Sequence, residues 1–199
     1  MAGRTRFRVT SLLGVVAVLV SWGFSGMAEG DARSRSLEKF LEKQGVAAES
    51  RAQIERSVAA AVRAGVPDRE ASDLVEACVE GGFTAAQVVR VFSLAAQIAL
   101  ERLPLESFTA KIDEGIAKRV DPDRIVQVAE RRALMLNRAK RILEDVLLDG
   151  APVRDRDELI PDVAEALEGG RPTDEIQGIL ISGFEEGASI GEIRRKFFP

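Results

Sequence analysis

The sequence contains no histidine and no tyrosine, and it has one cysteine and one tryptophan among 199 residues. Without histidine, a catalytic triad with an imidazole base and a zinc site with histidine ligands are both excluded. A single cysteine excludes a disulfide within the chain. We therefore expect neither a catalytic site of these classes nor a bound metal or cofactor.

The charged residues are nearly balanced, with 28 Lys and Arg against 32 Asp and Glu and a formal net charge of −4. The chain therefore lacks the positive excess that would attract nucleic acid or an anionic membrane. Hydrophobic residues make up 46% of the chain, which is the proportion of a folded domain rather than of a disordered one. We expect a globular protein that does not bind nucleic acid.

The first 28 residues have the pattern of a secretory signal peptide. Three arginines precede an uncharged, mostly apolar run over residues 9–24, and Gly26 and Ala28 occupy positions −3 and −1 of a cleavage site. The apolar run is short and interrupted, which favours cleavage; an uncleaved anchor in the inner membrane is the alternative. We expect an exported protein of the periplasm or the extracellular space, with no membrane span in the mature chain unless the signal is retained.

Removal of residues 1–28 takes away three arginines, no acid and the only tryptophan, so the net charge of the remaining chain falls from −4 to −7. Residues 29–44 are expected to form an N-terminal helix or a frayed segment. Residues 45–199 have the length of a single domain.

The apolar residues recur at the spacing of α-helices. Ala71, Leu74, Val75, Cys78 and Val79, for example, follow the i, i+3, i+4, i+7, i+8 pattern of one helix face. No convincing run of strict alternation appears. We therefore predict an all-α fold without a sheet.

Turns that contain glycine interrupt this pattern at four places, residues 65–67, 82–84, 170–172 and 187–189. Glycine adopts the left-handed conformation that closes a preceding helix. Thr84 and Ser189 each precede a Gln or Glu by three residues, which is the spacing of a capping box. Pro67 and Pro172 are expected in the first turns of the helices that follow.

Residues 45–92 align without gaps on residues 150–197 at an offset of 105, with twelve identical positions. The middle of the chain follows the same template more loosely at an offset of 54. We predict about three copies of a helical-hairpin unit with a period of 51–54, over residues 45–103, 104–149 and 150–199. Units of this kind bury their apolar faces by stacking, so the fold is expected to be a short α-solenoid or an irregular bundle.

In the middle copy the second turn is missing, so one long helix is expected to run from about Asp121 to about Leu148. Its apolar stripe consists of Ile125, Ala129, Ala133, Leu136, Ala139, Leu143 and Val146. We expect this face of the long helix to be buried.

The long helix also carries four arginines, and the chain ends near an aromatic pair; these candidates are Arg131, Arg132, Arg138, Arg141, Phe197 and Phe198. If the arginines lie on a solvated helix face and form i, i+4 ion pairs, no binding partner is needed to explain them. Alternatively, the six residues form a surface for a protein partner, for an anionic polymer of the envelope or for a second copy of the chain. Phe92 aligns with Phe197, which favours packing of Phe197 inside the fold.

Two further features have both a structural and a functional interpretation. Cys78 lies on an apolar stripe and aligns with Gly183, which predicts a buried small side chain. A disulfide with another chain or a nucleophilic thiol is the alternative. The acidic residues gather at helix ends and exposed faces, where solvation is expected, whereas a carboxylate pair in one cleft would suit a glycan-cleaving enzyme.

Residues Phe83 to Gln87 read FTAAQ and resemble, over these five residues, the Leu-Thr-x-x-Gln signature of small all-helical periplasmic stress chaperones. The physical content of the motif is the capping box at Thr84. The resemblance implies a periplasmic chaperone or stress adaptor as an alternative function. The leading prediction is a non-enzymatic, exported interaction or assembly module of the bacterial cell envelope.

Overall fold

A computed structural model describes residues 42, 48–147 and 156–198 of the chain. These residues form eight α-helices and one 3-10 helix and contain no strand, so the all-α prediction is confirmed for this part. The helices are α2 (Ala48–Ala64), α3 (Asp68–Glu80), α4 (Ala85–Leu100), α5 (Leu105–Ala117), α6 (Pro122–Leu147), η1 (Arg156–Leu159), α7 (Ile160–Glu168), α8 (Thr173–Glu185) and α9 (Ile190–Phe197). The predicted signal peptide and most of the predicted N-terminal segment lie outside the described residues.

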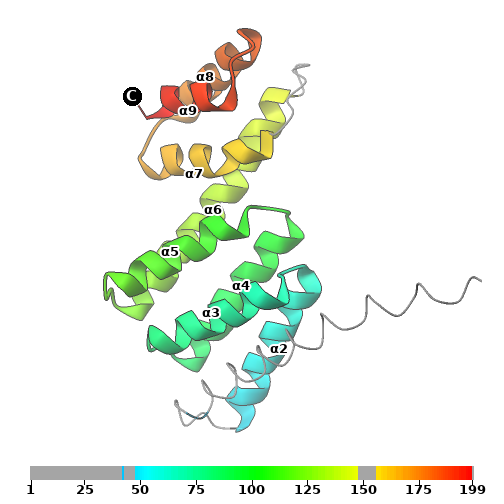
Figure 1. The fold of residues 1–199 in the computed structure, drawn as a ribbon, viewed down its shortest axis with the longest axis vertical. Helices are drawn as coiled ribbons and strands as arrows, with labels where there is room; N and C mark the ends of the chain where they lie inside the picture. Colours follow the sequence, from blue (N-terminus) through cyan, green and yellow to red (C-terminus); the bar gives the residue numbers. More distant parts are fainter. Residues whose placement is uncertain (1–41, 43–47, 148–155, 199) are drawn as a thin grey trace, which may run out of the picture.

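The helices follow one another along the long axis of the molecule, from α2 at one end to α8 and α9 at the other (Figure 1). Their main contacts join α-helices that are at most two positions apart in the chain. α2 packs against α4 and α4 against α6, while α3 packs against α5. α6 also contacts α7 and α8, so this helix connects the two ends of the stack.

α6 begins and ends within one residue of the bounds predicted for the long helix. Its 26 residues span about 39 Å at 1.5 Å per residue. The Asp121 carboxylate accepts a hydrogen bond from the backbone N–H of Asp123 and so caps the first turn. All residues of the predicted stripe are buried except Ala133, which is half-buried, so this prediction is confirmed.

Six of the described helices end in the same way. After α2, the N–H of Gly65 donates to the carbonyl of Val62, and the N–H of Val66 donates to the carbonyl of Ala61. This pair of bonds, a Schellman motif, also closes α3, α4, α5, α7 and α8. The residue with positive φ is glycine at four of these ends, residues 65, 82, 170 and 187.

At the other two ends, arginine adopts the left-handed conformation, with φ of 53° at Arg102 and 54° at Arg119. A side chain with a Cβ in this conformation costs about 1 kcal/mol relative to glycine. We therefore expect Arg119→Gly to raise the free energy of unfolding by about 1 kcal/mol, measured by urea denaturation. Arg124→Gly, inside α6, is the control and is expected to lower it by a similar amount. A loss of stability in both variants would contradict the assignment.

The helix bounds agree with the alignment of residues 45–92 on residues 150–197, which has an offset of 105 residues. α3 and α8 begin and end 105 positions apart, and α4 and α9 begin 105 positions apart. Both predicted capping boxes are present, formed by Thr84 with Gln87 and by Ser189 with Glu192. The aligned helices therefore start from the same local interactions.

The two prolines lie one residue earlier than predicted. Pro67 and Pro172 are the N-cap residues of α3 and α8, not members of the first turn. Their ψ angles of 144° and 145° are extended, and their carbonyls accept the first helical hydrogen bonds from Ala71 and Ile176. A proline therefore marks the start of each of these helices, but one position earlier than predicted.

Candidate interaction surface

Arg132 does not belong to an exposed surface, because only 4% of the residue is exposed. Its guanidinium donates to the hydroxyl of Ser107 in α5, at 2.6 and 3.1 Å. It also donates to the carboxylate of Glu168 at 3.2 Å and to the carbonyl of Pro161 at 3.3 Å, both in α7. The prediction that Arg132 contacts a partner is therefore wrong, since its donors join α5, α6 and α7.

Arg131 and Arg138 are exposed, but both already bind other parts of the chain. Arg131 Nη2 donates to the carbonyl of Glu168 at 3.3 Å, at the end of α7. Arg138 Nη2 donates to the hydroxyl of Thr173 at 2.6 Å, at the start of α8. These two arginines hold the C-terminal helices against α6.

Arg141 is exposed and lies on the side of α6 that faces α4. Within the described part of the chain it makes no hydrogen bond or ion pair. Of the four predicted arginines, Arg141 is the one without a hydrogen bond or ion pair to the residues that the structure describes.

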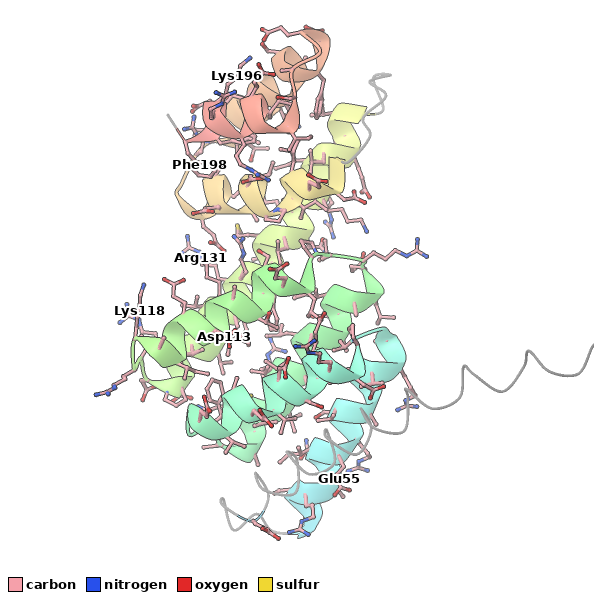
Figure 2. The ribbon with its side chains drawn as sticks, viewed as in Figure 1. Glu55, Asp113, Lys118, Arg131, Lys196 and Phe198 are labelled. Atoms are coloured by element: carbon pink, nitrogen blue, oxygen red, sulfur yellow. The ribbon has the colours of Figure 1, made fainter. Side chains whose placement is uncertain are left out.

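The two C-terminal phenylalanines have opposite environments. Phe197 is 1% exposed, and its carbonyl accepts a hydrogen bond from Arg171 at 2.9 Å, so packing inside the fold is confirmed for this residue. Phe198 is 45% exposed and meets Phe197 edge to face, with ring centroids 6.3 Å apart. Figure 2 shows Phe198 and Lys196 together at the C-terminal end of the fold. Phe198 and Arg141 line different hollows, and Arg132 is buried, so the six predicted residues do not form one surface.

An open groove of about 350 Å³ lies between α4 and α6. Its apolar lining includes Leu94, Ile98, Leu103 and Ala133. Leu134, on the α6 side, is 64% exposed although it is a large apolar residue. Single exposed aliphatic side chains are common on protein surfaces, and Leu134 is distinguished from them by its position in this groove.

Two ion pairs fix the register of α4 against α6 across this groove. Arg90 pairs with Glu130, 40 positions later, and Glu101 pairs with Lys140, 39 positions later. The Lys140 ammonium also donates to the carbonyl of Glu101 at 2.8 Å. The two helices therefore run parallel, and residues on this side of α4 face residues about 40 positions later in α6.

This register gives the groove four successive pairs of facing residues. Leu94 faces Leu134, and Gln97 faces Asn137, between the two ion pairs. The side-chain amides of Gln97 and Asn137 form no hydrogen bond to another residue that the structure describes. The groove thus presents an aliphatic pair, Leu94 and Leu134, followed by the amides of Gln97 and Asn137 and the guanidinium of Arg141.

Sequence reasoning did not identify Leu134, Gln97 or Asn137 as site residues. Leu134 could have been noticed in the sequence, because it is a large apolar residue that lies next to the predicted buried stripe of α6 and not on it. The facing of Gln97 and Asn137 depends on the packing of α4 against α6, which no local pattern in the sequence predicts.

A smaller hollow of about 140 Å³ lies between α3 and α5 and is lined by Glu70, Asp73 and Asp113. Partial burial, followed by the charges of Asp73 and Glu80, raises the pKa of the Asp113 carboxyl. No group of three metal-ligating side chains occurs among the described residues. The hollow is smaller than the roughly 300–1,000 Å³ of a typical ligand pocket.

Cys78 is fully buried, as the alignment with Gly183 predicts. Burial, with a smaller effect of the Asp113 charge, raises the pKa of its thiol to about 12. We expect iodoacetamide to label Cys78 in guanidinium chloride and to leave it unlabelled in mildly alkaline native buffer, measured by mass spectrometry. Rapid labelling of the native protein would contradict the burial of Cys78 and would again favour a disulfide between chains.

None of the helices in the described part combines the length and the apolar character needed to cross a membrane. No family model matches the chain, and neither the curated proteins nor the solved structures contain a match. The five residues that resemble a chaperone signature form the capping box of α4. The interpretation of the site therefore depends on the residues of the groove alone.

Proposed function

We propose that this chain is an exported, non-enzymatic interaction module of the bacterial cell envelope that binds a protein partner in the groove between α4 and α6. The observation that carries the proposal is Leu134, 64% exposed beside the buried Leu94 in the groove between α4 and α6. A partner that covers Leu134 gains the transfer free energy of an aliphatic side chain, about 1.5–3 kcal/mol. The ion pairs at both ends hold the groove open in one register, which lowers the entropic cost of binding.

We further propose that the fold arose as a short solenoid of duplicated units. This interpretation is supported by α3 and α8, which begin and end 105 residues apart, and by the aligned capping boxes at Thr84 and Ser189. Contacts limited to near neighbours in the chain are typical of stacked repeats, which present extended surfaces to partners.

A protein is favoured over an anionic polymer as the partner. A polyanion would need several free cations on one surface, and in the described part Arg131, Arg132 and Arg138 are all bonded within the fold. A chaperone remains the second candidate, since Leu100 and Phe198 are exposed in addition to Leu134. Suppression of client aggregation at near-stoichiometric amounts would favour the chaperone.

The proposal is tested by affinity capture from envelope extract with matched variants. Leu134→Ser removes the aliphatic side chain of the groove, and Leu100→Ser removes one that is 69% exposed on α4 and outside the lining of the groove. We expect a specific protein to be captured by the wild type and by Leu100→Ser, and to be lost with Leu134→Ser. Equal capture by both variants would contradict the assignment of the groove. The mass of the mature protein tests the export signal separately.

A further inference from the structure

We propose that the contact between α3 and α5 is a pH-sensitive joint of the stack, weaker at neutral pH, where carboxylates of the two helices repel one another, and stronger in acid, where they are protonated. This inference goes beyond the proposed function, because it concerns the response of the stack to its surroundings and not the partner of the groove. It follows from the residues that line the joint, from the engagement of the nearby cations elsewhere and from the position of Asp113.

The joint is lined by acids from both helices. The hollow of about 140 Å³ between α3 and α5 is formed by Glu70, Asp73 and Leu74 of α3 and by Thr109 and Asp113 of α5. Figure 2 shows Asp113 on the side of α5 that faces α3. All the charged residues that line the hollow are acids, so their charges oppose the contact of the two helices.

The lysines of α5 do not compensate the charge of Asp113. Lys111 and Lys118 both form ion pairs with Glu114, the residue next to Asp113 in the sequence. Asp113 itself makes no hydrogen bond or ion pair with the residues that the structure describes. Two adjacent acids of one helix thus have opposite environments, because one faces carboxylates and the other faces two ammonium groups.

The arginines of the neighbouring helices are also engaged. On α3, Arg69 lies 4.0 Å from the carboxylate of Asp73, and both side chains are exposed. α4 and α6 pack against α5 as well. The one charged residue of α4, Arg90, is bound to Glu130, and the guanidinium that α6 directs toward α5, that of Arg132, is bound to Ser107 and to α7.

The charges act across the joint in both directions. Partial burial, followed by the charges of Asp73 and Glu80 in α3, raises the pKa of the Asp113 carboxyl. Conversely, after burial itself, the charge of Asp113 contributes to the raised pKa of the Cys78 thiol in α3. The carboxylate of Asp113 is therefore close enough to α3 to affect groups in its exposed and in its buried face.

The direction of the pH dependence follows from the pKa shift. A carboxyl group with a higher pKa in the folded than in the unfolded chain binds its proton more tightly when folded, so Asp113 makes the fold more stable as the pH falls through this pKa. Glu114 acts in the opposite sense, because its hydrogen bonds and ion pairs with the two lysines lower its pKa and are lost in acid.

The experiment compares Asp113→Asn with Glu114→Gln as its matched control in the full chain. We expect Asp113→Asn to raise the Tm at about pH 7 by about 1–3 °C, a modest shift because Asp113 is exposed to water. Glu114→Gln should lower the Tm at the same pH. Both differences from the wild type should shrink toward zero at about pH 4, where the native carboxyl groups take up protons.

Hydrogen exchange locates the effect. At about pH 7 the backbone amides of α3 should exchange about twofold more slowly in Asp113→Asn than in the wild type, since a stronger joint opens less often. The amides of α9, at the other end of the stack, should not change. A Tm of Asp113→Asn at or below that of the wild type at about pH 7, an equal shift at both pH values, or unchanged exchange in α3 would overturn the proposal.

Discussion

Replacement of Arg132 by alanine is expected to lower the free energy of unfolding by about 3 kcal/mol. The guanidinium is buried and binds Ser107, Pro161 and Glu168, so its removal leaves several polar groups without their partner. The side chain of Glu168 is 21% exposed, and water therefore compensates part of the loss. Guanidinium chloride denaturation of the full chain measures the change.

Arg131→Ala is the matched control for this prediction. Arg131 is the preceding residue of the same helix and is exposed, and its single hydrogen bond to the carbonyl of Glu168 is long at 3.3 Å. We expect a loss of less than about 1 kcal/mol. Similar losses in the two variants would show that Arg132 does not connect α5, α6 and α7 in solution.

The second large effect is expected at Gly183, where the aligned units differ in a complementary way. A Cβ added to Gly183 would lie 2.7 Å from Cγ1 of the buried Ile193. The residues aligned with Gly183 and Ile193, 105 positions earlier, are Cys78 in α3 and Val88 in α4, and both are buried. The summed volume of the two side chains is similar in the two aligned segments.

Gly183→Cys is therefore expected to destabilise the protein by about 2 kcal/mol through overpacking. Ile193→Val alone should cost about 1 kcal/mol, because it removes one buried methyl group. The double variant removes Cδ1 of Ile193, which would lie 3.0 Å from the added Cβ, and keeps Cγ1, so its loss should be somewhat smaller than the sum of the single losses. Additive losses, measured by the same denaturation, would show that positions 183 and 193 are not in contact in solution.

Local signals in the sequence were sufficient to predict the helices and their ends. Glycine at the left-handed position and the capping boxes at Thr84 and Ser189 act within a few residues, so their patterns can be read directly. The buried stripe of α6 follows in the same way from its period. Arg119 shows the limit, because its left-handed conformation does not follow from the residue type.

The site was harder to predict because it depends on contacts between distant helices. Arg131 and Arg132 are adjacent in the sequence, yet one is exposed and the other is buried against α5 and α7. The packing of α7 against α6 determines which of the two arginines is buried. Likewise, the pairing of Gln97 with Asn137 depends on the register of α4 against α6, which the ion pairs at Arg90 and Glu101 set.

The function of the groove is tested most directly by photo-crosslinking in intact cells that produce the protein. A photoreactive amino acid is placed at position 134 in one strain and at position 100 in another, since Leu134 and Leu100 are 64% and 69% exposed. We predict that position 134 crosslinks to one protein of defined mass and that position 100 does not. Equal crosslinking from the two positions, or none from position 134, would contradict the assignment of the groove between α4 and α6 as the partner site.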